Sequence, residues 1–172
     1  DYDYNVGDVK GVSTTYMEIA RSLKFWDMPL AVQLEYNGGF GQYAPGMAFQ
    51  INDAYLGGLQ YTWNNDDFSK VLTLQALYKY IRGKHDASFQ ITGVWGLHFF
   101  NRKLSFTGFA DFWMEEKMIA GKETKFVFLT EPQLWFNFTK NISLGSEVEV
   151  GYNFVNTEGI TVCPTLAARW SF

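Results

Sequence analysis

Cysteine, histidine and long apolar runs are almost missing from this sequence. Cys163 is the single cysteine, and there are two histidines among the 172 residues, so neither an internal disulfide nor a Cys/His metal site is expected. The sequence also has no uninterrupted run of about 20 apolar residues, which a membrane-spanning helix needs. These absences exclude a disulfide scaffold and helical membrane spans, and they predict a protein without a metal or cofactor.

Clusters of positive charge are missing as well. The 14 Lys and Arg residues are outnumbered by 18 Asp and Glu residues, which gives a formal net charge of −4. The basic residues stand singly along the chain, whereas binding to a phosphate backbone needs several of them close together. We therefore expect no nucleic-acid partner.

Aromatic residues, in contrast, are abundant. They make up 19% of the chain, as much as all charged residues together, while the mean hydropathy is only −0.14. A transmembrane β-barrel combines these features, because only every second residue of a strand faces lipid and aromatic residues gather at the membrane interfaces. The composition therefore permits a β-barrel.

Apolar and polar residues alternate with period two between turn signals along most of the chain. Within 142–154, Leu144, Val148 and Val150 share one face, whereas Glu147 and Glu149 share the other. Soluble strands average about 5 to 6 residues, but these segments run 13 to 16, enough to cross a bilayer at a tilt of about 45°. The predicted segments are an opening stub at 1–5 and then 12–25, 29–41, 51–64, 68–82, 86–100, 103–117, 124–139, 142–155 and 159–172, ten in all.

Aromatic residues mark one end of these segments, as a girdle at one membrane interface would. They are Phe25, Trp26, Trp63, Phe99, Phe100, Phe136, Phe138, Trp170 and Phe172. With the C-terminus at the periplasmic rim, the connections WDMP, WNNDDF, FNRK and TKN are predicted on the periplasmic side. The connections YNVGDVKG, QYAPGMAFQ, RGKHD, MIAGKE and NTEG are then predicted outside, with QYAPGMAFQ (42–50) as the first candidate for a plug. The last residues, TLAARWSF, resemble the signal that the barrel-assembly machinery recognises, so we expect that machinery as a partner during biogenesis.

A family resemblance covers nearly the whole chain. It is carried by YMEIARSLKFW, LEYNGGF, SFQITGVWGLHFFN, FTGFADFW, FVFLTEPQLWFNF, SLGSEVEVGYNF and PTLAARWSF. Together these segments look like an outer-membrane family of unassigned function that is related to the nucleoside-specific channel-forming (Tsx-like) porins. The resemblance implies location in the outer membrane and a barrel of twelve strands. Residues 1–172 are then expected to be a single barrel domain that lacks its first two strands and the start of a third.

The alternation also predicts which side chains face the lumen. Near the bilayer midplane, Lys or Arg costs about 2 to 4 kcal/mol on the lipid side and Asp or Glu costs less, so the phase of the charged residues assigns the inner wall. The candidate solute-binding residues on this wall are Phe109, Asp111, Trp113, Glu115, Glu131, Gln133, Asn137, Glu147, Glu149 and Arg169. Earlier segments add Glu18, Lys24, Gln33, Glu35, Gln75, Lys79, Gln90 and His98. Phe109 and Trp113 would offer stacking faces to a planar solute, and the polar side chains would bind it by hydrogen bonds.

The sequence therefore predicts an outer-membrane channel for small polar solutes. An acidic wall repels phosphates, so nucleosides should pass more readily than nucleotides. A second reading is a closed structural or assembly-partner barrel of a larger outer-membrane complex, with the inward aromatic residues filling a narrow lumen.

A third reading is a barrel enzyme that uses His98 as a general base. No serine stands beside His98 on a lipid-accessible face, so no enzymatic activity is expected.

Arg21 falls on the lipid side with Ile19 and Leu23, which requires either a bulge or a side chain that reaches the interface.

Overall fold

The computed structural model describes residues 2–84, 88–155 and 157–172, and every helix or strand among them is a β-strand. None of the described residues belongs to a helix long and apolar enough to span a membrane. The predicted all-β class is confirmed. The strands are β1 (Tyr2–Tyr4), β2 (Val12–Leu23), β3 (Leu30–Ala44), β4 (Met47–Asn64), β5 (Lys70–Ile81), β6 (Ser88–Phe99), β7 (Leu104–Ile119), β8 (Lys122–Thr130), β9 (Gln133–Asn137), β10 (Ile142–Tyr152), β11 (Ile160–Pro164) and β12 (Ala167–Trp170).

All strands join one antiparallel sheet in which β1 to β8 lie side by side in chain order. β8 and β9 both lie between β7 and β10, and β11 and β12 both pair with β10. Each of these pairs is one interrupted strand, so the twelve strands occupy ten positions across the sheet. The ten predicted segments correspond to these positions, although 124–139 and 159–172 were each expected to be continuous.

The interruption between β8 and β9 has a local cause. Pro132 follows Glu131 at the break, and proline has no N–H to donate to a ladder. On the neighbouring strand Gly108 faces this point, and a Cβ there would lie 2.5 Å from the Glu131 carbonyl oxygen. The Trp95 ring, which also contacts Phe106, covers the glycine. A small residue at 108 is therefore required for the strands to approach.

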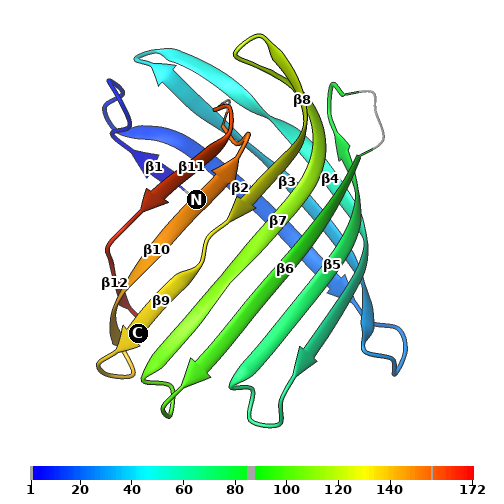
Figure 1. Cartoon of the computed structure of the whole chain (residues 1–172), viewed down its shortest axis with the longest axis vertical. Helices are drawn as coiled ribbons and strands as arrows, with labels where there is room; N and C mark the ends of the chain where they lie inside the picture. The colour runs from blue at the N-terminus through cyan, green and yellow to red at the C-terminus, as the bar shows by residue number, and fades with distance from the viewer. Residues whose placement is uncertain (1, 85–87, 156) are drawn as a thin grey trace.

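The connections lie at the two ends of the strands (Figure 1). Residues 24–29, 65–69, 100–103 and 138–141 form the lower edge of the sheet in this view, and the C-terminus lies there too. The predicted grouping of these connections at one rim is confirmed. Lys24, predicted inward, lies in the first of these turns, one residue after β2 ends.

The upper connections differ more from expectation. The predicted loop at 42–50 is wrong, because β3 continues to Ala44 and β4 begins at Met47. Gly46, with φ +75°, makes a two-residue turn with Pro45 in which glycine accommodates the left-handed backbone. Residues 42–50 therefore do not form the predicted plug, because most of them belong to β3 and β4. The predicted connections 82–86 and 156–159 lie partly outside the described residues.

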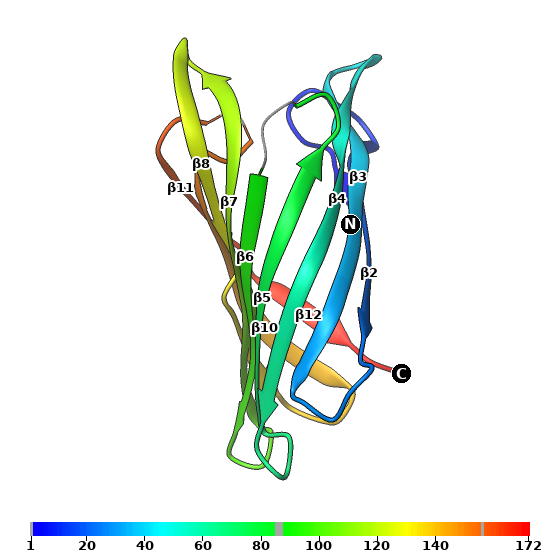
Figure 2. The same ribbon diagram turned by 90° about the vertical axis from the view of Figure 1, so that its right-hand side faces the viewer.

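The sheet is strongly curved (Figure 2). β2–β4 and β7, β8 and β11 stand on opposite sides, joined through β5 and β6. The Asp3 and Glu149 carboxyl groups, on β1 and β10, interact electrostatically across the opening. Lys79 on β5 reaches Trp113 on β7 over the intervening β6. Side chains two strands apart can meet in this way only on the concave side.

The two faces of the sheet differ in composition, and β5 shows the pattern. Leu72, Leu74 and Tyr78 are exposed on one face, whereas Gln75 and Lys79 are buried on the other. We call the first the apolar face and the second, which is concave, the polar face. A small apolar cluster of Ala54, Leu56, Leu77 and Ile81 interrupts the polar face near the upper edge. The arrangement is the reverse of a soluble protein, in which apolar side chains are buried.

Arg21 lies on the apolar face, as its phase predicts. The β2–β3 ladder runs without a register shift from Thr14 to Leu23, and Arg21 pairs with Leu34. A bulge is therefore not the explanation. Arg21 is two residues from the end of β2, so its long side chain can reach toward the lower edge.

Candidate solute-binding face

The strand register places eight of the ten predicted site residues on the polar face. Ladder pairs join Trp113 with Gln90, Asp111 with Thr92, Phe109 with Val94, Gln133 with Thr107 and Glu147, Asn137 and Arg169 with Ser143, and Glu149 with Cys163. Glu115 and Glu131 lie at irregular positions. Glu115 accepts a hydrogen bond from Trp113, and Glu131 interacts electrostatically with Glu147, Glu149 and Asp111.

Near the upper edge, Trp113 is the centre of one cluster. The Lys79 Nζ atom lies 4.4 Å from the centroid of the Trp113 ring and donates to Gln90 Oε1 at 2.7 Å. Trp113 Nε1 donates to Glu115 Oε2 at 3.0 Å, and Lys117 forms an ion pair with Glu115 at 3.3 Å. This cluster holds an ammonium group on an aromatic face.

The middle of the face is a chain of hydrogen bonds. Gln90 Nε2 donates to Thr92 Oγ1 at 3.0 Å, and Thr92 Oγ1 donates to Asp111 Oδ1 at 2.5 Å. Because Gln90 also accepts from Lys79, two neutral side chains connect a buried cation to a carboxylate. Phe109 lies beside this chain and is half-buried.

A second aromatic cluster lies near the lower edge. The Arg169 guanidinium is 4.5 Å from the Trp135 ring centroid, and Trp135 Nε1 donates to Gln133 Oε1 at 3.0 Å. Gln133 in turn donates to Glu147 Oε2 at 2.5 Å. Asn137 completes the cluster through contacts with four neighbours, Arg102, Ser105, Ser143 and Arg169.

Carboxylates outnumber cations on the polar face. Glu18, Glu35 and Asp111 interact electrostatically with one another across the curved sheet. Among the residues that the structure describes, Glu115–Lys117 is the one ion pair that includes a residue predicted for the lumen, namely Glu115. No group of three or more His, Cys, Asp or Glu side chains in the described part of the chain is placed to hold a metal ion.

A known protein family matches the chain over its full given length. The family described as Domain of unknown function (DUF5020) matches residues 1–172. The chain belongs to the DUF5020 family. No curated protein and no solved structure matches it.

The Trp113 ring, predicted from the sequence to offer a stacking face, is covered in the DUF5020 structure. Trp113 is only 7% exposed, with Lys79 over its ring and Phe154 edge-to-face at 6.2 Å. Trp135 is equally buried beneath Arg169. Of the two aromatic residues expected to stack on a solute, Phe109 is therefore the more accessible.

His98 has a partner in the DUF5020 structure that the sequence did not indicate. Ser105 pairs with it in the ladder, and its Oγ lies 2.9 Å from His98 Nδ1. Ser105 also accepts from Asn137 and is only 3% exposed, on the polar face. The Ser105 hydroxyl is therefore buried and hydrogen-bonded to both His98 and Asn137.

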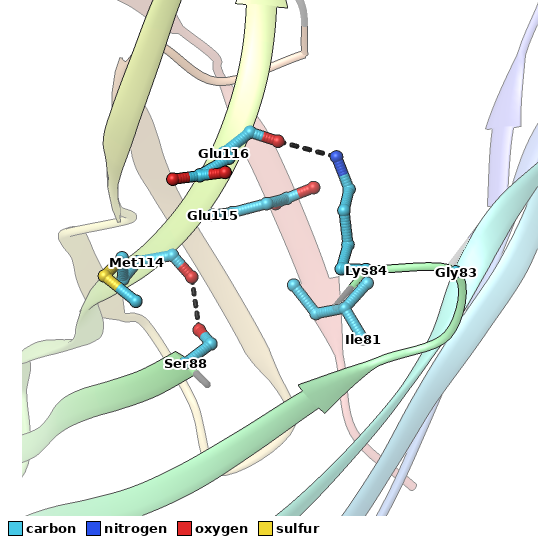
Figure 3. Close-up of a pocket in the computed structure, with 7 residues that line it drawn as sticks. All are labelled: Ile81, Gly83, Lys84, Ser88, Met114, Glu115 and Glu116. Carbon is cyan, nitrogen blue, oxygen red and sulfur yellow. Dashed lines mark hydrogen bonds between the residues drawn. The ribbon is translucent and has the colours of Figure 1, made fainter. Parts of the chain in front are cut away.

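A cavity of about 250 Å³ lies at the upper edge, where β5 and β6 meet β7 (Figure 3). Lys84 Nζ donates to the Glu116 carbonyl oxygen at 2.6 Å, and Ser88 Oγ donates to the Met114 carbonyl oxygen. Both bonds reach the irregular stretch of β7 between Met114 and Lys117. They fix the backbone on both sides of Glu115, whose carboxylate accepts from Trp113. The cavity and the upper cluster are thus one continuous region.

Sequence periodicity identified the faces of the DUF5020 sheet, but not these contacts. The pairs Lys79–Trp113 and Arg169–Trp135 each bridge an intervening strand. Such contacts depend on the curvature of the sheet, for which a single sequence has no local signal. Tyr16, which pairs with Gly39 on the polar face, is an inward aromatic residue that the sequence reading did not include.

Proposed function

We propose that this chain forms most of a transmembrane β-barrel in a bacterial outer membrane, with its C-terminus at the periplasmic rim. The observation that carries the proposal is the reversed distribution of side chains across the sheet. Large apolar residues such as Ile19, Leu59 and Leu134 are exposed on the convex side, whereas Gln33 and Gln75 are buried on the concave side. Lipid is the environment in which this reversal is favourable.

Two bands of aromatic rings support insertion of the sheet in a membrane. Near the upper edge, ring contacts join Tyr36 to Tyr55, Tyr55 to Tyr80, and Phe112 to Phe89 and Phe126. At the lower edge, further contacts join Phe136 to Phe138 and Trp170 to Phe172. Aromatic girdles of this kind mark the two interfaces of a membrane.

A lipid environment also requires that the sheet close. In the described part of the chain, β1 pairs with Val12–Thr15 of β2 only, and β11 and β12 have β10 as their one neighbour. Unpaired backbone groups are costly in lipid, so we propose further strands between these edges. The resemblance to the nucleoside-specific porins implies twelve positions around the barrel, two more than the ten positions of the described sheet. The barrel-assembly machinery would fold this barrel, and lipid would be the partner of its convex face.

Inside such a barrel, the polar face supports passage of small polar solutes. Its excess of carboxylates repels phosphorylated compounds and admits neutral ones, nucleosides among them. Phe109, half-buried and beside the Thr92–Asp111 hydrogen bond, is the accessible stacking surface. Passage needs no chemical step, so the proposal assigns the protein no enzymatic role.

Flux measurements in liposomes test this function. The protein is reconstituted, and uptake of a labelled nucleoside, the matching nucleotide and a sugar of similar size is compared. Faster nucleoside flux that falls in Phe109→Ala is expected, with Phe138→Ala, at the lower rim, as the control. Equal flux of nucleoside and nucleotide would contradict the proposed selectivity.

A closed structural or assembly barrel is the second candidate. It is favoured by the saturation of the polar face, since the side chains of Trp113, Gln133, Trp135 and Asn137 each donate a hydrogen bond to a neighbouring side chain. This candidate predicts zero conductance in planar bilayers together with stable co-purification of another outer-membrane protein. Measurable conductance of the purified protein would exclude it.

A further inference from the structure

Lys79 occupies an unusual position for a lysine. It is only 7% exposed, on the concave face, where its ammonium group contacts the Trp113 ring and the Gln90 carbonyl oxygen. Among the described residues it has no ion-pair partner within 4 Å. The carboxylates of Glu115, Asp111 and Glu35 nevertheless interact with it favourably, and the opposing charge of Lys117 is paired with Glu115.

These neighbours are those of a receptor for an organic cation. An aromatic face attracts an ammonium through its quadrupole, an amide oxygen accepts one of its three N–H groups, and nearby carboxylates supply a favourable field. The Trp113 ring is held in place by its own bond to Glu115 and by the Phe154 ring. Gln90 is held by Thr92. The site is thus organised by residues other than the lysine it holds.

We propose that Trp113, Gln90 and the surrounding carboxylates form a binding site for a primary ammonium group, which the chain fills with its own Lys79. Lys79 then determines the specificity of the proposed channel for solutes. This part of the inference rests on the proposed function. With the site filled, the Trp113 ring is closed to a cationic solute, although the net charge of the polar face is negative. Neutral solutes keep access to Phe109.

The test empties the site and refills it from solution. Lys79→Ala removes three methylene groups and the ammonium, which together correspond to n-propylammonium. Binding of n-propylammonium to the purified variant in detergent micelles is measured by calorimetry, with 1-propanol as the neutral probe of the same size. We expect n-propylammonium to bind roughly tenfold more tightly than 1-propanol, and Trp113→Leu in the same background to abolish most of this difference.

Lys79→Met is the matched control, because its side chain fills the same volume without a charge. Neither it nor the wild-type protein should bind n-propylammonium. If Lys79→Ala does not fold alone, n-propylammonium in the refolding mixture should restore the folded species, seen by its heat-modifiable gel mobility, and 1-propanol should not. Equal effects of the two probes, or no effect of either, in binding and in refolding would overturn the proposal.

Binding and refolding in micelles do not require a conducting pore, so these results are independent of the transport proposal. In liposomes, Lys79→Ala should raise the uptake of a small ammonium solute several-fold relative to a neutral one. Lys70→Ala, on the same strand but on the other face, should leave that ratio unchanged. Binding of n-propylammonium to Lys79→Ala without measurable flux of any solute would support the ammonium site and contradict the proposed channel.

Discussion

Asn137 should be the residue whose loss most weakens the lower end of the sheet. Its Nδ2 donates to the Arg102 carbonyl oxygen at 2.6 Å and to Ser105 Oγ at 3.0 Å, while its Oδ1 accepts from Ser143 at 2.6 Å and from Arg169 at 3.4 Å. Asn137→Ala removes four hydrogen bonds, of which those to the exposed arginines count least. It also leaves the buried Ser143 hydroxyl unsatisfied, so we expect a loss of about 2 to 4 kcal/mol in the free energy of unfolding.

Urea unfolding of the protein in lipid vesicles, followed by tryptophan fluorescence, measures this loss. Asn141→Ala is the control, because Asn141 is an exposed asparagine of the neighbouring turn whose side chain donates one bond, to Ser171. That control should cost about 0.5 to 1.5 kcal/mol. Equal losses for the two variants, or less than about 0.5 kcal/mol for Asn137→Ala, would refute the assignment of Asn137 as the central member of the network.

Three further predictions concern other parts of the chain. Leu74→Arg, at the middle of β5 on the apolar face, should lower the free energy of unfolding in vesicles by about 2 to 4 kcal/mol. Thr73→Arg, on the polar face, should lower it distinctly less, and equal losses would contradict a lipid-facing Leu74. Gly108→Ala should prevent β7 from approaching the break after β8, because the new Cβ would lie 2.5 Å from the Glu131 carbonyl oxygen. The variant should unfold at a lower denaturant concentration than the wild type, and an unchanged midpoint would contradict this. In the turn after β4, hydrogen bonds from Ser69 hold the pKa of Asp67 below its usual range. Asp67 therefore stabilises the fold above its unfolded pKa and loses that contribution as pH falls through the lowered one, so the midpoints of wild type and Asp67→Asn should converge in acid.

Much of the architecture was predictable because strand periodicity is a local property. The phase of residues 103–117 and 142–155 assigned side chains to the two faces, and the ladder pairs agree with those assignments. Pro132 and the Pro45–Gly46 pair also gave usable signals. A proline in mid-segment marks a ladder break, and Pro-Gly marks a two-residue turn, yet 124–139 was read as continuous and 42–50 as a long loop.

The contacts of the site were not predictable in the same way. Whether Trp113 offers an open ring or a covered one depends on Lys79, which lies 34 positions earlier in the sequence and two strands away. Sheet curvature brings the two together, and curvature is set by the whole sheet. The sequence could therefore assign Trp113 to the correct face, but not tell that its ring is occupied.

The exposure of one face of β10 to lipid is the central claim, and spin labels along this strand test it most directly. Cysteines are placed singly at 142–152 in a Cys163→Ser background, labelled, and the protein is reconstituted in lipid vesicles. Collision with oxygen should peak at Leu144, Val148 and Val150, and collision with a water-soluble nickel chelate should peak at Glu147 and Glu149. Nickel accessibility that is equally high on both faces would contradict insertion in a membrane.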